Sequence, residues 1–126
     1  MSYWLGNLKV NSVVEIDINT FLQAGGSATV STLTLSTDDI KIYKDSSLIE
    51  RTSISGVTLS IDHDTTTGCH IIKIDTSDNT DPGFYSKGSD YKVKIVGVTI
   101  DGQTVNAFVG RFSIENRYSK GHRYNE

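Results

Sequence analysis

Residues 57–75 read VTLSIDHDTTTGCHIIKID and contain the strongest structural signal in the chain. Apolar residues and one histidine occupy alternate positions on both sides of a short polar segment: Val57, Leu59 and Ile61 before it, and His70, Ile72 and Ile74 after it. Alternation with a period of two is typical of a half-buried β-strand. Between the two runs, Asp64 can bond the backbone that follows it, and Gly68 can adopt the left-handed conformation of a bulged loop. The stretch therefore predicts a β-hairpin.

The same alternation recurs along most of the chain. It places the following residues on one face of each run: Val14, Ile16 and Ile18; Ile40 and Ile42; Tyr91, Val93 and Ile95; and Phe108, Gly110, Phe112 and Ile114. Short segments rich in Gly, Asp and Ser separate the runs, and no segment keeps helical spacing for three turns. Short strands broken at even intervals predict an all-β sandwich or barrel.

The chain length of 126 residues fits one domain, and we expect residues 1–126 to form a single β-sandwich with short arms at 1–10 and 118–126. The formal net charge of -3 argues against the basic surface that is typical of nucleic-acid-binding domains. One cysteine, Cys69, excludes an intrachain disulfide. No apolar run approaches the ~20 residues that cross a bilayer, and we expect neither a signal peptide nor a membrane partner.

The hairpin segment also contains the residue types that bind metals. Counted as a calcium loop from Asp62, it fails where glycine and glutamate are required, because those positions hold Thr67 and Lys73. Cys69 and His70 are adjacent on a predicted strand and point to opposite faces, so they cannot easily share a transition metal. No nucleophile elbow or phosphate loop occurs in the sequence. We therefore expect no metal, no cofactor and no catalytic residues.

Aromatic and basic residues gather near both ends of the chain. Six of them are candidate interface residues: Tyr3, Trp4, Arg117, Tyr118, Arg123 and Tyr124. Tyr, Trp and Arg anchor many protein interfaces, and ordering a free arm costs roughly 1–2 kcal/mol of backbone entropy per residue. We expect these arms to become ordered on a neighbouring subunit. A small nucleic-acid-binding arm is the alternative interpretation of the C-terminal segment.

The segment DPGFYSKGSDYKVKIVG, residues 81–97, resembles the entry to the penultimate strand of immunoglobulin-like sandwiches. A tyrosine there locks the corner by bonding its hydroxyl to backbone, with Tyr91 the first candidate and Tyr85 the second. Residues 38–117 resemble a family of small structural proteins of tailed bacteriophages, the immunoglobulin-like modules of tail and baseplate proteins. The phrases TGCHIIKID, DGQTVN and FSIENR carry most of that resemblance, whereas KDSS departs from it, because the family usually has Asp-Gly there.

The resemblance implies an immunoglobulin-like β-sandwich of about seven or eight strands, in a virion protein without enzymatic activity. It would be assembled in the host cytoplasm and would bind other virion structural proteins and copies of itself at the tail, neck or baseplate. A capsid-decorating protein is the alternative within this class. A carbohydrate-binding or host-adhesion module is the alternative from another class, with Tyr85, Tyr118 and Tyr124 stacking on sugars; an enzyme is a further alternative.

Overall fold

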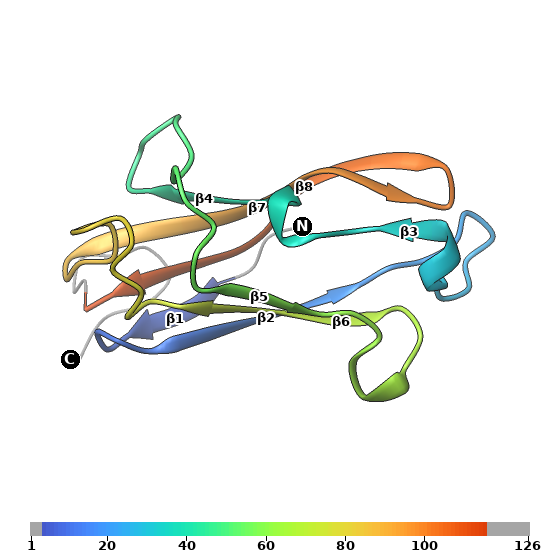
Figure 1. The fold of residues 1–126 in the computed structure, drawn as a ribbon, viewed down its shortest axis with the longest axis horizontal. Coiled ribbons are helices and arrows are strands. Elements are labelled where there is room, and N and C mark those ends of the chain that lie inside the picture. Colours follow the sequence, from blue (N-terminus) through green and yellow to red (C-terminus); the bar gives the residue numbers. More distant parts are fainter. Residues whose placement is uncertain (1–3, 116–126) are drawn as a thin grey trace.

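The computed structural model describes residues 4–115, which form two β-sheets (Figure 1). The larger sheet contains β1 (Trp4–Leu8), β3 (Leu33–Thr34), β4 (Ile40–Lys44), β7 (Ser89–Ile100) and β8 (Gln103–Ile114). The smaller sheet contains β2 (Val13–Asn19), β5 (Val57–Ser60) and β6 (Cys69–Asp75). The helical segments of the described residues are three short 3₁₀ turns: η1 (Val30–Thr32), η2 (Thr37–Asp39) and η3 (His63–Thr65). The all-β prediction is confirmed.

The two sheets pack face to face around one hydrophobic core to which both contribute. The strand order is β2-β6-β5 in the smaller sheet and β1-β8-β7 in the larger, where β7 also pairs with β3 and β4. Strand β2 buries Val14, Ile16 and Ile18 and exposes the residues between them. Strands β4, β6 and β7 likewise bury the apolar residues that the alternation placed inside. Period-two alternation therefore predicted most of the core.

Strands β7 and β8 form a long antiparallel hairpin whose register is interrupted twice. A two-residue turn at 101–102 joins them, with φ angles of 49° and 78°, as a type I′ turn requires. One interruption is a bulge at Val109, which adds a residue to β8 and reverses its alternation. As a result Val109 is buried and Phe108 is 44% exposed. The prediction that Phe108 shares a face with Phe112 is therefore wrong.

The segment expected as an arm at 1–10 contributes strand β1 to the larger sheet. This strand runs parallel to β8, with Trp4 opposite Arg111. Leu5 and Leu8 pack against the core. The register shifts within β1, so its two inward leucines are three residues apart and give no period-two signal. The described part of this segment therefore belongs to the sandwich.

The hydroxyl of Tyr91 bonds to upstream backbone at the corner before β7, as predicted from the sequence. Its hydroxyl donates to the carbonyl oxygen of Phe84 at 2.7 Å and accepts the backbone N–H of Ser86 at 2.8 Å. Its buried ring stacks on Phe112, with the two ring centroids 5.0 Å apart. Burial raises the pKa of Tyr91, so the hydroxyl keeps the proton that it donates. These contacts fasten the loop before β7 to the core.

Candidate functional site

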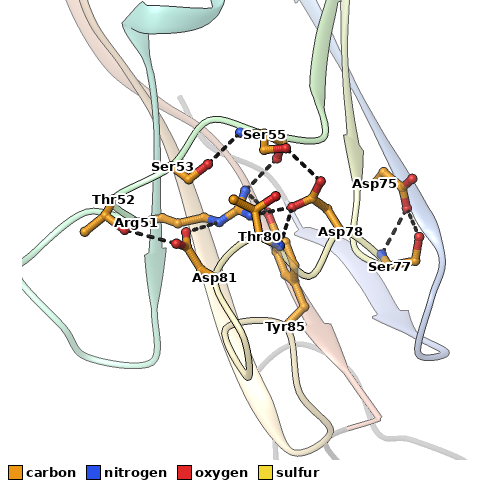
Figure 2. A network of polar contacts seen from close by, with 10 residues as sticks. All are labelled: Arg51, Thr52, Ser53, Ser55, Asp75, Ser77, Asp78, Thr80, Asp81 and Tyr85. Carbon is orange, nitrogen blue, oxygen red and sulfur yellow. Dashed lines mark hydrogen bonds and ion pairs between the residues drawn. The ribbon is translucent and has the colours of Figure 1, made fainter.

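Arg51, which follows β4, lies at the centre of a buried polar network (Figure 2). Its guanidinium is 2.9 Å from the carboxylate of Asp78 and 2.8 Å from that of Asp81. It also donates to the carbonyl oxygen of Ser55 at 2.8 Å and lies 5.0 Å from the ring centroid of Tyr85. The network joins the loop between β4 and β5 to the loop between β6 and β7.

Two ionisable groups of this network are held in fixed protonation states. The backbone N–H of Thr80 and then the hydroxyl of Ser55 lower the pKa of Asp78 to about 2. Burial raises the pKa of Tyr85 to about 12. At neutral pH Asp78 is therefore ionised and Tyr85 protonated, and neither is suited to proton transfer as a general acid or base. We interpret the arginine network as structural.

The loop between β5 and β6 is the second candidate. Strands β5 and β6 pair antiparallel, so the hairpin prediction is confirmed. Gly68 has a φ of 81°, the left-handed conformation expected for it. The carboxylate of Asp62 accepts the backbone N–H of Gly68 at 3.0 Å. Asp62 therefore makes the carboxylate-to-backbone bond of this loop that the sequence analysis assigned to Asp64.

Both ring nitrogens of the buried His70 are used within the fold. Its Nδ1 accepts the backbone N–H of Asp62 at 3.0 Å, and its Nε2 lies 2.9 Å from the hydroxyl oxygen of Thr20. Because Nδ1 accepts, the neutral ring carries its proton on Nε2 and donates it to Thr20. Burial lowers the pKa of His70, which favours this neutral form. Within residues 4–115, no three His, Cys, Asp or Glu side chains are grouped to hold a metal ion.

The outer face of the larger sheet displays basic and aromatic side chains from three adjacent strands. We refer to this surface as the basic face; it consists of one row of Lys41, Lys94 and Phe108 and a second row of Tyr43, Lys92 and Arg111. Each row follows residues that pair directly across β4, β7 and β8, and such residues share one face of a sheet. The residues that alternate with them on β4 and β7 are buried in the core.

The cations of the basic face oppose one another across the strands. Lys41 lies opposite Lys94, and Lys92 lies opposite Arg111. Glu50 lies 3.2 Å from Lys41. Within residues 4–115, no carboxylate forms an ion pair with Lys92, Lys94 or Arg111. The face therefore carries positive charge that the described chain does not neutralise.

Aromatic and aliphatic side chains surround this charge. The ammonium of Lys94 lies 4.8 Å from the ring centroid of Tyr43 and 5.6 Å from that of Phe108. An open pocket of about 230 Å³ lies beside the two rings and is bordered by the loop after β4. That loop projects from the sheet (Figure 1), with Leu48 93% and Ile49 77% exposed. Apolar surface and fixed positive charge are therefore adjacent.

This arrangement can bind carboxylates or phosphates by charge-assisted hydrogen bonds and apolar groups by direct contact. No family model, curated protein or solved structure matches the chain. Among the described residues, no helix has both the length and the apolar character to cross a membrane. The chemistry of the basic face therefore indicates the ligand, an anionic group beside apolar surface.

Trp4 is the one interface candidate from the sequence that the structure describes. It pairs with Arg111 at the end of the second row of the basic face. Its neighbour Leu5 packs against the core, so alternation places Trp4 on the outer side of the sheet. The other five candidates lie outside the described residues: Tyr3, Arg117, Tyr118, Arg123 and Tyr124.

Tyr85, expected to be exposed for stacking on sugars, is packed within the arginine network. Its ring centroid lies 5.0 Å from that of Phe84 and 5.5 Å from that of Tyr91. The expectation of an exposed ring is wrong, because the loop before β7 folds back over the core and carries Tyr85 with it. Tyr118 and Tyr124, the other tyrosines proposed for stacking, lie outside the described residues.

The basic face was not predicted from the sequence. Lys92 and Lys94 alternate with buried residues, and that spacing already placed two cations on one side of a strand. The partners of the two lysines lie on β4 and β8, and only the register of the sheet brings them together. Two lysines at alternate positions of one predicted strand were thus the available sequence signal for this face.

Proposed function

We propose that the chain is a non-enzymatic structural protein of a tailed-phage particle and that the basic face binds a neighbouring subunit. The observation that carries the binding role is the opposition of cations, with Lys92 opposite Arg111 and Lys41 opposite Lys94. The Lys92–Arg111 pair, which no carboxylate of residues 4–115 neutralises, costs the isolated sheet roughly 0.2–1 kcal/mol. Glu50 offsets the charge of Lys41 in the other pair. The fold does not require this cost, because neutral polar residues suit an outer face equally well. Carboxylates of a partner would convert the repulsion into attraction.

The architecture proposed for this protein is the immunoglobulin-like sandwich. In that architecture strands B, E and D form one sheet, and strands C, F and G belong to the other. Assigning β2, β6 and β5 to the first set and β4, β7 and β8 to the second reproduces the neighbours found here. Tyr91, near the start of β7, makes the bond to upstream backbone that a tyrosine corner makes at the start of strand F. Strand order and corner both support this assignment.

The place in a phage particle is supported by the resemblance of residues 38–117 to tail and baseplate modules. That segment includes all six residues of the basic face. Tail, neck and baseplate are the proposed locations, and the capsid surface is the alternative within the same class. Each of these places surrounds a subunit with others, which is the setting that a charged docking face requires.

Particles produced by the genome that encodes the chain provide the test. We expect mass spectrometry to find the chain in purified particles. We also expect cryo-electron microscopy to show its two-sheet domain in contact with another subunit. Absence of the chain from particles that are otherwise complete would overturn the proposal.

A pair of charge reversals tests the basic face itself. Lys92→Glu should reduce incorporation into particles, whereas Lys9→Glu makes the same charge change at an exposed residue outside the face and should not. Lys92→Glu also removes the repulsion with Arg111, so the melting midpoint of the isolated domain should not fall. Equal incorporation of the two variants would exclude the basic face as a docking surface.

A further inference from the structure

The charges of the described chain are strongly segregated. The sequence contains 15 acidic and 12 basic residues, and residues 116–126 account for one acidic and three basic ones. Four of the nine basic residues that remain lie on the basic face. The rest of the described chain thus carries 14 acidic against five basic residues, a formal charge of −9. Outside its basic face, the described part of a second copy is therefore itself an acidic surface.

We infer that the basic face binds the outer face of the smaller sheet on a second copy of this chain. The inference rests on the docking role proposed above and adds the identity of the partner. The receiving surface, which we refer to as the acidic face, consists of Glu15, Asp17 and Asp64. Glu15 and Asp17 alternate with buried residues of β2, and all three carboxylates belong to exposed residues.

The acidic face has the features that a basic partner needs. Asp17 and Asp64 line one open pocket of about 430 Å³, together with Ile71 and other residues. Val13, at the start of the same strand, is 57% exposed and adds apolar surface. Lys73 lies 3.9 Å from Glu15 and is a basic residue of this surface. Among residues 4–115, carboxylates therefore outnumber cations on this surface, as cations outnumber carboxylates on the basic face.

A protein partner fits the basic face better than a polyanion does. Single-stranded nucleic acids bind by stacking bases on free aromatic faces between cations. Here Lys94 already lies over the rings of Tyr43 and Phe108, so stacking would have to displace it. The exposed Leu48 and Ile49 beside the face offer aliphatic surface, which a protein can cover and a phosphate backbone cannot.

The two faces lie on opposite sides of the sandwich, and this determines the kind of assembly (Figure 1). A contact between two different surfaces is heterologous, so each copy still has one face free after binding and the assembly continues as a row or closes as a ring. Three strands of about five residues present roughly 250 Å². That is well below the roughly 800 Å² per partner of a standard interface. The contact is therefore weak between free copies and sensitive to salt.

Sedimentation velocity of the purified chain, over a concentration series, tests this inference. The wild type should form larger species in about 50 mM salt and dissociate in about 500 mM, because salt screens the attraction. Lys92→Glu on the basic face and Asp17→Lys on the acidic face should each weaken association about tenfold, or about 1.4 kcal/mol. Melting midpoints control for folding, and Glu15→Lys replaces Asp17→Lys if that variant is destabilised.

An equal mixture of the two variants gives the decisive result. The intact basic face of Asp17→Lys can bind the intact acidic face of Lys92→Glu, and the product has no functional face left. The mixture should therefore form two-chain species and nothing larger. A mixture that remains monomeric, or a wild type that stays monomeric at low salt, would overturn the inference.

The same variants separate this inference from the proposed function. If Lys92→Glu fails to enter particles while the wild type does not self-associate, the docking face stands and its partner is another acidic protein. If Lys92→Glu instead abolishes binding of a fluorescent single-stranded oligonucleotide without changing sedimentation, the face binds nucleic acid. Both results would refute the second copy as the partner.

Discussion

Gly68 is a position where replacing a single hydrogen by a methyl group should be damaging. Its φ of 81° is in the left-handed region, and an added Cβ would lie 2.9 Å from the Cβ of Ser27 and 2.9 Å from the carbonyl oxygen of Thr20. That oxygen accepts the backbone N–H of Ala28 at 3.0 Å, and the N–H of Thr20 donates to the carbonyl of Gly68 at 2.9 Å. The clash therefore falls on hydrogen-bonded backbone, which cannot rotate away.

Two terms set the magnitude for Gly68→Ala. The left-handed conformation costs an alanine roughly 1–2 kcal/mol. Displacing the backbone of a packed loop costs a further 1–3 kcal/mol or so, as overpacking generally does. We expect a loss of about 3 kcal/mol in the free energy of unfolding. Gly68→Asn adds the same Cβ, so the tolerance of Asn for positive φ should recover only the first term.

Gly83 provides a matched control. Its φ is 80°, and an added Cβ would meet no atom within 4 Å. Gly83→Ala therefore carries the conformational term without the clash, and the two alanines change the entropy of the unfolded chain alike. Urea unfolding should show Gly68→Ala to be less stable than Gly83→Ala by at least about 1 kcal/mol. If the two variants lose the same free energy of unfolding, the loop at 20–28 moves aside without cost and the clash argument is wrong.

Three further predictions concern polar groups of the fold. Because burial lowers the pKa of His70 below 6.5, the unfolded chain takes up a proton at a higher pH than the folded chain does. The free energy of unfolding should therefore be greatest above pH 6.5 and decrease as the pH drops below it, and the urea midpoints of His70→Gln should not show this decrease. Tyr91→Phe should destabilise by about 1–2 kcal/mol in the same assay, since the partly buried N–H of Ser86 and carbonyl of Phe84 lose the hydroxyl; a loss below about 0.5 kcal/mol would mean that water replaces it. Ser55→Ala should raise the pKa of Asp78 above about 2 in an NMR titration, and an unchanged pKa would show that the hydroxyl of Ser55 does not lower it.

The sequence predicted those parts of the fold in which alternation is uninterrupted. Val14, Ile16 and Ile18 are buried as expected, because each strand residue reverses the direction of the one before it. Phe108 is exposed against expectation, because the bulge at Val109 inserts one residue and reverses every position before it. No local composition marks that bulge, so its place depends on which residues of β7 and β8 pair.

The candidate site was less predictable than the fold because it depends on pairing alone. Lys41, Lys92 and Arg111 are far apart in sequence and are ordinary surface residues when each is considered by itself. They become neighbours through the register of β4, β7 and β8. Tyr91 was predictable for the opposite reason, since its hydroxyl bonds backbone only five to seven residues away.

The parallel pairing of β1 with β8 also constrains the order in which the strands of the domain can fold. Trp4 pairs with Arg111, so β1 has no partner strand until almost the whole described chain has been synthesised. At roughly 5–20 residues per second, the ribosome takes about 5–20 s to make that partner. Closing so long a loop is also slow, because its entropy must be lost before the contact forms. We therefore expect β1 to insert late in folding, and in a crowded polysome it can pair with the β8 of a neighbouring nascent chain and give a strand-swapped dimer.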